Sequence, residues 1–148
     1  MEFHSRSEQD TIRLAEKTAE KLRAGDILFL EGDLGMGKSV FARALIRTLA
    51  DEPELEVPSP TFTLVQTYDA PVGPVWHFDL YRIRDPMEIY ELGWEEALDG
   101  GIVLIEWPSR LGNGLAPARR LEIRFTALPE QDGRVITLTP YGHWETLS

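Results

Sequence analysis

The stretch Gly32-Asp33-Leu34-Gly35-Met36-Gly37-Lys38-Ser39 constrains the fold of this chain more than any other feature. It follows Ile27-Leu28-Phe29-Leu30, a continuous apolar run typical of a strand buried on both faces of a parallel sheet. Apolar residues then continue at helical spacing, at Val40, Phe41, Ala44, Leu45 and Leu49. Strand, glycine-rich turn and helix in this order predict an α/β fold with a phosphate-binding loop.

The chemistry expected of this loop follows from its residue types. Glycines let successive backbone amides point at one anion, and the following helix adds its positive end. Lys38 is expected to reach the terminal phosphates, and the Ser39 hydroxyl to bind Mg²⁺, which prefers oxygen ligands. A tight turn without any ligand is the simpler alternative. The strand before the loop and the helix after it favour the phosphate site.

Three further segments have recognisable local signals. Ser7 and Asp10 have the spacing of a capping box at the start of a helix, and Gly25 is expected to end that helix. The prolines at 58 and 60 exclude a regular element over residues 57–61. Asp85-Pro86 is expected to start a short helix.

The remaining apolar segments predict strands. Two are expected at 62–68 and 75–79, and a buried one at 102–106. Residues 121–126 and 135–139 alternate apolar and polar side chains, which predicts an antiparallel edge hairpin around Gln131-Asp132-Gly133. With no repeat or linker, residues 1–148 are expected to form a single α/β domain with a mixed sheet.

Acidic residues end two of the predicted strands. Glu106 follows Ile102-Val103-Leu104-Ile105, and Asp79 follows Val75-Trp76-His77-Phe78. Phosphate chemistry assisted by Mg²⁺ needs an acid near the loop, at the carboxyl end of a neighbouring strand. Glu106 is the better candidate for the metal, and Asp79 is expected to hold the same ion or to orient the attacking water. Taken singly, either acid could simply mark the place where a strand meets water.

Two threonines follow the prolines, and the chain lacks one GTPase signature. Thr61 and Thr63 could form a switch-like loop that senses the γ-phosphate, or they could be ordinary turn residues. The Asn-Lys-x-Asp signature of guanine recognition requires an asparagine, and the sequence has only Asn113, in Leu111-Gly112-Asn113-Gly114. Guanine recognition through that motif is therefore excluded, and ATP is favoured.

Composition limits the partners and the compartment. The formal net charge is −10, whereas a protein that binds nucleic acid directly usually presents a basic surface. The acidic residues either keep the chain soluble or form a docking surface for a protein. The chain has no cysteine, only three scattered histidines and no apolar run long enough to span a membrane. The polar N-terminus lacks a signal sequence, so a cytoplasmic protein is expected.

Four sequence blocks, taken together and in this order, resemble the TsaE (YjeE) family of bacterial tRNA threonylcarbamoyladenosine biosynthesis. They are Gly-Asp-Leu-Gly-Met-Gly-Lys-Ser (32–39), Ser-Pro-Thr-Phe-Thr-Leu-Val (59–65), His-Phe-Asp-Leu-Tyr-Arg (77–82) and Glu-Trp-Pro (106–108). The phosphate loop alone is shared by many families. The last two blocks carry the specific resemblance, which runs from about Ser7 to the final strands.

The resemblance implies a fold, an activity and partners. The fold is that of P-loop NTPases, with a mixed, mostly parallel sheet flanked by helices. The activity is slow ATP hydrolysis with Mg²⁺. The partner is the TsaB–TsaD heterodimer, in which TsaD transfers the carbamoyl group to tRNA, while the ATPase supports repeated turnover of the complex.

The resemblance also implies roles for individual residues. Lys38, Asp79 and Glu106 are expected to act in hydrolysis, and Ser39 and Glu106 to hold the metal. Thr61 lies in the switch-like loop and Trp107 beside the metal acid. Ser39 and Phe62 depart from the commoner threonine and tyrosine, and Ser39 keeps the hydroxyl. The expected nucleotide contacts come from Thr11, Gly35, Met36, Gly37, Lys38, Ser39 and Val40.

Two other functions use the same loop. A small-molecule kinase would transfer the phosphoryl group to an acceptor, with Arg119-Arg120 as a conceivable lid pair, although the chain has no arginine-rich insertion after the loop. A nucleotide-gated binding module would bind ATP without needing to hydrolyse it.

Overall fold

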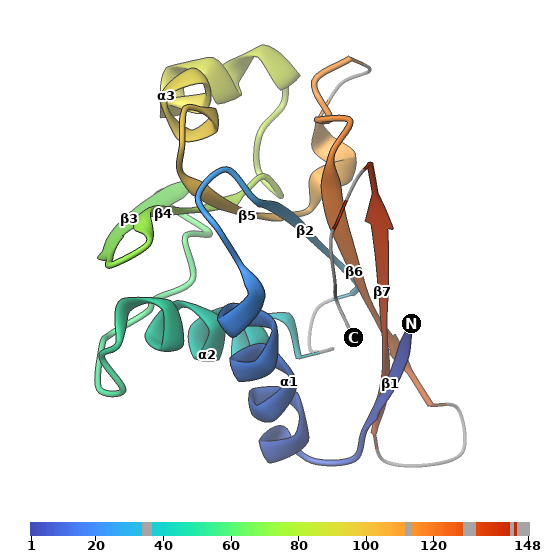
Figure 1. Ribbon diagram of the computed structural model, residues 1–148. Coiled ribbons are helices and arrows are strands. Elements are labelled where there is room, and N and C mark those ends of the chain that lie inside the picture. The colour runs from blue at the N-terminus through green and yellow to red at the C-terminus, as the bar shows by residue number, and fades with distance from the viewer. Residues whose placement is uncertain (34–36, 112–113, 129–132, 143, 145–148) are drawn as a thin grey trace.

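A computed structural model describes residues 1–33, 37–111, 114–128, 133–142 and 144. Helices separate most of the strands along the chain, except at two antiparallel hairpins, one in the middle and one at the end (Figure 1). In order they are β1 (Glu2–Ser5), α1 (Glu8–Lys21), β2 (Ile27–Glu31), α2 (Lys38–Ala50), β3 (Val65–Ala70), β4 (Gly73–Asp79), the 3₁₀ helix η1 (Pro86–Leu92), α3 (Trp94–Leu98), β5 (Ile102–Glu106), the 3₁₀ helix η2 (Pro108–Arg110), β6 (Arg120–Ala127) and β7 (Arg134–Tyr141).

The described strands form one seven-stranded sheet with the order β1-β7-β6-β2-β5-β4-β3. The four central strands β6, β2, β5 and β4 pair in parallel, and the pairs β3–β4, β6–β7 and β1–β7 are antiparallel. The centre of the sheet is made of apolar runs such as Ile102–Glu106, in which every residue is buried. Such runs suit strands covered on both faces. The expected mixed sheet with a parallel centre is confirmed.

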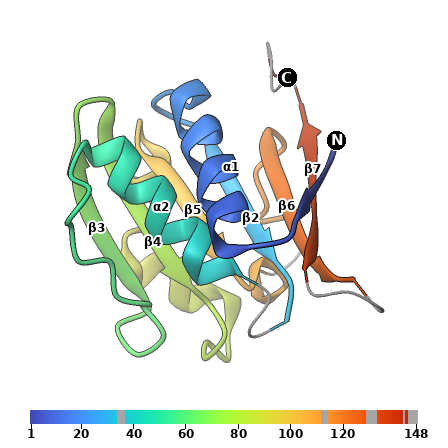
Figure 2. The ribbon, with the colours of Figure 1, turned by 90° about the horizontal axis from the view of Figure 1, so that it is seen from below.

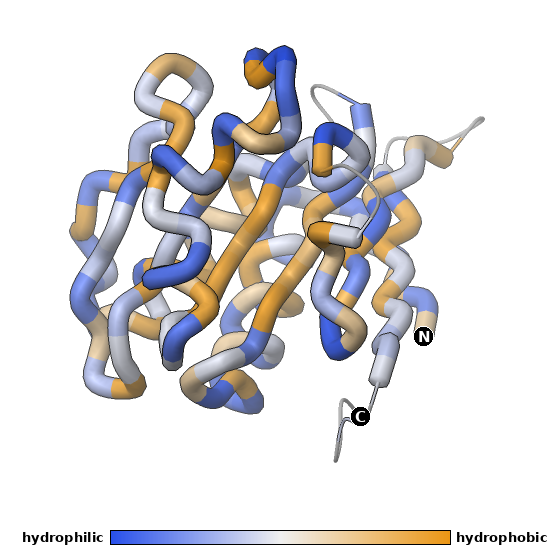
Figure 3. The backbone as a smooth tube through the Cα atoms, turned by 90° about the horizontal axis from the view of Figure 1, so that it is seen from above, coloured by the Kyte–Doolittle hydropathy of each residue, from blue (hydrophilic) through white to orange (hydrophobic). Residues whose placement is uncertain are grey.

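Helices cover both faces of the sheet. Helices α1 and α2 lie side by side across one face (Figure 2), and their apolar side chains pack on Leu28, Leu30 and Leu104. The 3₁₀ helix η1 and helix α3 cover the other face, where Ile89 and Trp94 pack on side chains of β4 and β5. Figure 3 shows the resulting hydrophobic segments running through the middle of the molecule. Because side chains alternate along a strand, the central strands β2, β4 and β5 contribute to both cores.

Local signals set the helix starts. Ser7 caps α1, and its hydroxyl accepts a hydrogen bond from the Asp10 amide at 3.2 Å. Asp85 caps η1 in the same way for the Met87 amide.

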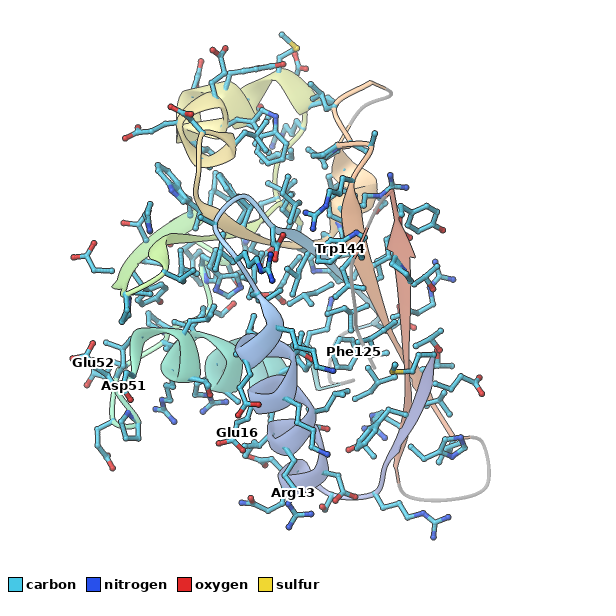
Figure 4. All side chains as sticks on the ribbon, in the orientation of Figure 1. Arg13, Glu16, Asp51, Glu52, Phe125 and Trp144 are labelled. Atoms are coloured by element: carbon cyan, nitrogen blue, oxygen red, sulfur yellow. The ribbon has the colours of Figure 1, made fainter. Side chains whose placement is uncertain are left out.

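Arg13 and Glu16 point away from the sheet on the solvent side of α1 (Figure 4). Among the described residues, no helix combines the length and the apolar character that crossing a membrane would require.

Two predicted boundaries and one predicted position in the sheet were wrong. Gly25 does not end the first helix: α1 stops at Lys21, and the Gly25 amide donates to Gly101 O in the turn before β2. The strand expected at 62–68 begins only at Val65, because Leu64 has φ +70° and its amide bonds Pro60 O in a turn. The predicted hairpin of residues 121–126 and 135–139 is present, but it does not form an edge of the sheet.

Strand β1 covers that edge and was not predicted. It pairs antiparallel with β7, from Glu2 opposite Thr137 to Ser5 opposite Arg134. On its other side the hairpin joins the sheet, since β6 pairs in parallel with β2. Of the predicted hairpin turn Gln131-Asp132-Gly133, the first two residues lie outside the described residues, within the undescribed stretch 129–132. A four-residue strand in a polar N-terminus is too short to give a clear alternation pattern.

One close backbone approach fixes where the phosphate loop leaves β2. Gly32 has φ +144°, and a Cβ placed there would lie 2.7 Å from the backbone oxygen of Phe125 on β6. Both the backbone conformation and the space exclude a side chain. The first glycine of the loop therefore allows β2 and β6 to remain paired while the chain turns away.

We expect Gly32→Ala to destabilise the protein more than Gly100→Ala. Gly100 also has positive φ, +90°, but nothing lies within 4 Å of its added Cβ. Backbone strain costs about 1–3 kcal/mol at either position, and overpacking against Phe125 adds about 1–3 kcal/mol at Gly32 only. Urea denaturation of both variants measures the difference. Equal losses in the free energy of unfolding would contradict the close approach.

Candidate functional site

The carboxyl ends of three parallel strands meet at one edge of the sheet. Leu30 of β2 pairs with Glu106 of β5, and Glu106 pairs with Asp79 of β4. The loop from β2 leads into α2, whose N-cap is Gly37 in a left-handed conformation without a side-chain cap. The amides at the start of α2 therefore have no capping side chain, and they point to the same edge as the two carboxylates.

Lys38 is the first residue of α2, and its side chain is buried with 5% exposure. Its ammonium nitrogen has no hydrogen-bond partner among the described residues. Burial lowers the pKa of Lys38 below its ordinary value, while the charges of Glu106, Asp79 and Asp33 act to raise it. A buried ammonium without hydrogen bonds is a site for an anion that can accept them.

Glu106 is held by a histidine from the neighbouring strand. His77 Nε2 lies 2.7 Å from Glu106 Oε2, and both side chains are buried. A carboxylate accepts hydrogen bonds, which places the ring hydrogen on Nε2; His77 Nδ1 is buried without a partner among the described residues. His77 thus fixes one Glu106 oxygen and leaves the other available to a ligand.

Asp79 is oriented by three contacts at the end of β4. Its Oδ2 accepts from the Thr61 hydroxyl at 3.2 Å, and its Oδ1 accepts from the Tyr81 amide at 3.0 Å. The Asp79 amide donates to Leu64 O at 3.0 Å. The loop containing Thr61 is therefore tied to the end of the strand at the candidate site.

Trp107 turns back over the lysine. It has φ +59°, one of the few left-handed non-glycine residues described, and Pro108 follows it. Lys38 Nζ lies 4.0 Å from the centre of the Trp107 ring, and the Tyr81 ring lies 4.8 Å from the same indole. The indole face attracts the ammonium. An unusual backbone conformation at such a position is typical of functional sites.

Two cavities flank this pair, and both are lined by Lys38 and Trp107. The larger, about 590 Å³, extends from Gly32 and Asp33 to the end of β6 at Phe125. The smaller, about 250 Å³, is lined by Gly37, Lys38, Ser39, Val40, Ser59, Thr61, Asp79, Glu106 and Trp107. The structure thus brings together most of the predicted site residues around one small cavity.

Three predicted nucleotide contacts are not placed there. Gly35 and Met36 lie outside the described residues. Thr11 is buried in α1, where its hydroxyl shares a 2.6 Å hydrogen bond with Ser5. It lines neither cavity. The role expected of Thr11 remains a prediction.

The donor set suits magnesium bound together with phosphate. Within the described ranges, no cluster of three His, Asp or Glu side chains could hold a metal unaided. Mg²⁺ does not need one, because it keeps several waters and is usually bound by one or two protein oxygens plus substrate phosphates. Ser39 and Glu106 face the same cavity and supply oxygens of these types.

The sequence did not reveal the role of His77, which looked like an ordinary core histidine of a strand. The signal was available in the strand pattern. His77 and Asp79 are two residues apart on β4, so their side chains lie on the same face. Glu106 is on the adjacent strand, opposite Asp79.

We expect His77→Leu to lower the free energy of unfolding by about 1–3 kcal/mol, because it leaves the buried Glu106 carboxylate without its partner. His77→Gln, which keeps a donor, should lose less. The double variant His77→Leu/Glu106→Leu should recover part of the loss, since removing both partners removes the unpaired group. Thermal or urea denaturation of the unmodified chain, His77→Leu, Glu106→Leu and the double variant completes the cycle, with His77→Gln measured beside them. Additive losses would argue against the His77–Glu106 bond.

A comparison with family sequence models gives a match to residues 5–136. The matching model is described as "Threonylcarbamoyl adenosine biosynthesis protein TsaE". It covers the loop, both carboxylates, His77 and Trp107, and it ends within β7.

Curated proteins and a solved structure are similar to the chain over most of its length. The tRNA threonylcarbamoyladenosine biosynthesis protein TsaE of Rickettsia bellii is 42% identical, over 90% of this chain and 90% of that protein. Its namesake from Bacillus subtilis is 37% identical, over 91% and 82%. The crystal structure of Bacillus subtilis YdiB superposes with a TM-score of 0.78 at 30% identity, covering 96% of this chain and 86% of YdiB. The buried lysine, the two strand-end acids and these similarities together show that the chain belongs to the TsaE family.

Proposed function

We propose that the chain binds ATP with Mg²⁺ at Lys38 and hydrolyses it. The observation that carries the proposal is the buried Lys38 ammonium, which has no hydrogen-bond partner among the described residues and faces the carboxylates of Glu106 and Asp79. A terminal phosphate would supply the missing acceptors, and a magnesium ion would separate the phosphate charge from the two carboxylates.

Each residue around the smaller cavity takes a role set by its chemistry. Lys38 binds the terminal phosphates, and the amides that begin α2 bind the same group. Ser39 and the free oxygen of Glu106 would hold Mg²⁺, which would supply neutralisation of the charge on the γ-phosphoryl group. Asp79, fixed by Thr61 and the Tyr81 amide, orients water for attack on the γ-phosphorus. The water oxygen bonds the γ-phosphorus, and the bond from that phosphorus to the β–γ bridging oxygen breaks. The proton from the water ends on the released phosphate, and ADP leaves.

The larger cavity is suited to the nucleoside. Its volume of about 590 Å³ lies within the usual range for small-molecule sites, and it adjoins the smaller cavity at Lys38 and Trp107. Adenine is the base we propose, because the sequence lacks the asparagine-based signature of guanine recognition. Pro108 and Phe125 give that cavity apolar walls.

We propose that this ATPase acts in tRNA threonylcarbamoyladenosine synthesis through the TsaB–TsaD heterodimer, in the cytoplasm. The names of the relatives support the pathway. The net charge of −10 supports a protein partner rather than direct contact with tRNA. In this scheme ATP hydrolysis resets the complex for the next turnover. The chain does not touch the carbamoyl group that TsaD transfers to tRNA.

The small-molecule kinase is the weaker alternative. Its imagined lid pair, Arg119 and Arg120, is engaged elsewhere: Arg119 bonds Asp26 at 2.8 Å, and Arg120 bonds Glu122 at 2.7 Å. Neither arginine lines the smaller cavity. Phosphate appearing on an added acceptor instead of in water would favour the kinase.

We expect Lys38→Ala to reduce ATP turnover by roughly 10²–10³-fold, the usual effect of removing one donor that stabilises transition-state charge. The fold should survive, since the change removes a buried charge. Release of inorganic phosphate measures the rate, and circular dichroism checks the fold. Lys17→Ala, at an exposed position on α1, is the matched control and should leave turnover unchanged. Undiminished hydrolysis by Lys38→Ala would contradict the site.

Purified TsaB–TsaD should raise the rate of ATP hydrolysis when titrated into the chain, because the proposal makes the protein complex the user of ATP. The initial rate at saturating ATP measures the effect. Glu106→Gln should bind ATP and the heterodimer but fail to support repeated tRNA modification. Normal modification with this variant would instead support a nucleotide-gated binding module.

A further inference from the structure

Two exposed aromatic rings and two arginines form a surface beside the smaller cavity. Phe62 is 79% exposed, the most exposed large hydrophobic side chain of the described residues, and Tyr81 is 43% exposed. The Arg82 guanidinium lies 4.5 Å from the centre of the Phe62 ring, and that of Arg110 lies 5.7 Å from the Tyr81 ring. We call Phe62, Tyr81, Arg82 and Arg110 the aromatic–arginine surface.

The composition of this surface is unusual for solvent-exposed residues. Single exposed apolar side chains are common and need no explanation. Here, however, a phenylalanine whose burial would be favourable stays in water, with an arginine guanidinium over its ring. Aromatic residues and arginine, placed together, are the residue types that dominate binding energy in protein interfaces.

The local charge is opposite to that of the whole chain. The segments that build or border the surface, residues 59–64, 80–84 and 107–110, contain Arg82, Arg84 and Arg110 and no acidic residue. Of the acids that directly flank these segments, Asp79 and Glu106 are buried, and only Asp85 is exposed. Acids outnumber cations in the chain, 25 to 15. Asp51 and Glu52 lie at the C-terminal end of α2, the end away from Lys38 (Figure 4). The surface is thus a small cationic and aromatic area on an acidic protein.

These charges favour an acidic protein over a nucleic acid as the occupant. Binding to nucleic acid gains most of its free energy from neutralising many phosphates, and the surface offers only two arginines, Arg82 and Arg110, on a chain of net charge −10. Two cations stacked on exposed rings suit a partner with an apolar pocket and a rim of carboxylates.

The surface is connected to the nucleotide site through both of its aromatic residues. Phe62 follows Thr61, whose hydroxyl donates to Asp79. The Tyr81 amide donates to the same carboxylate, and the Tyr81 ring contacts Trp107, which lies over Lys38. A shift of Asp79 or Trp107 when phosphate binds would therefore move Phe62 and Tyr81.

We propose that the aromatic–arginine surface is a docking site for a protein partner with an acidic, apolar pocket, and that its affinity depends on the nucleotide at Lys38. The proposal rests on the proposed function, since it requires a nucleotide at that site. It adds the surface that the partner contacts and the route by which the partner senses the nucleotide. Phe62 is the anchor, and Arg82 and Arg110 orient it.

The test measures the affinity of the full chain for purified TsaB–TsaD by calorimetry, with a non-hydrolysable ATP analogue and with ADP. Phe62→Ser should weaken binding at least tenfold and remove the difference between the two nucleotides. Phe62→Tyr keeps the ring and should bind normally. Met87→Ser is the matched control, because Met87 is 61% exposed on η1. Arg82→Glu should also weaken binding, through repulsion from the acidic rim.

Hydrolysis by the free chain separates this proposal from the proposed function. Phe62→Ser should keep the basal rate of ATP hydrolysis, whereas Lys38→Ala should lower that rate strongly. If Phe62→Ser and Arg82→Glu bind the heterodimer like the unmodified chain, the docking surface is wrong while the ATPase assignment stands. If the unmodified chain hydrolyses ATP but does not bind the heterodimer, the surface is overturned together with the partner. Loss of binding to a tRNA transcript alone would assign the surface to nucleic acid and also overturn it.

Discussion

Parallel pairing of β2, β5 and β4 is the constraint on which the rest of the site depends. It brings the loop that follows Leu30 and the carboxylates of Glu106 and Asp79 to one edge of the sheet. Burial of the Lys38 ammonium among them is unfavourable for a charged group, and the neighbouring acids offset only part of that cost. The free protein therefore holds a cation that is desolvated but not satisfied, which is the condition under which an added anion binds well.

The centre of the fold could be predicted because its signals are local. The apolar runs at 27–30 and 102–105 predict buried strands, and the spacing of apolar residues after Lys38 predicts a helix. The failures lie where tertiary contacts override local patterns. Val65 starts β3 late because the preceding turn is bonded to Pro60 and Asp79. Strand β1 exists because β7 offers it an edge, and four residues of sequence cannot show that.

The site was predictable in its residue types but not in its connections. Lysine, serine and the two strand-end acids could be named from spacing alone, and the structure places them around one cavity. The bonds of His77 to Glu106 and of Thr61 to Asp79 join residues 29 and 18 positions apart. Such bonds depend on strand register. The nucleotide contact expected of Thr11 came from the resemblance and stays a prediction; in the structure its hydroxyl is paired with that of Ser5.

The contact of Gly32 with Phe125 has a consequence for how the protein acquires its ligand during synthesis. The phosphate loop leaves a strand whose neighbours, β5 and β6, come roughly 75 and 93 residues later in the chain. A nascent chain from which β6 has not yet emerged lacks the strand against which the loop turns. Under the proposed function, affinity for ATP therefore requires β6, and ATP stabilises only nascent chains that already extend past that strand.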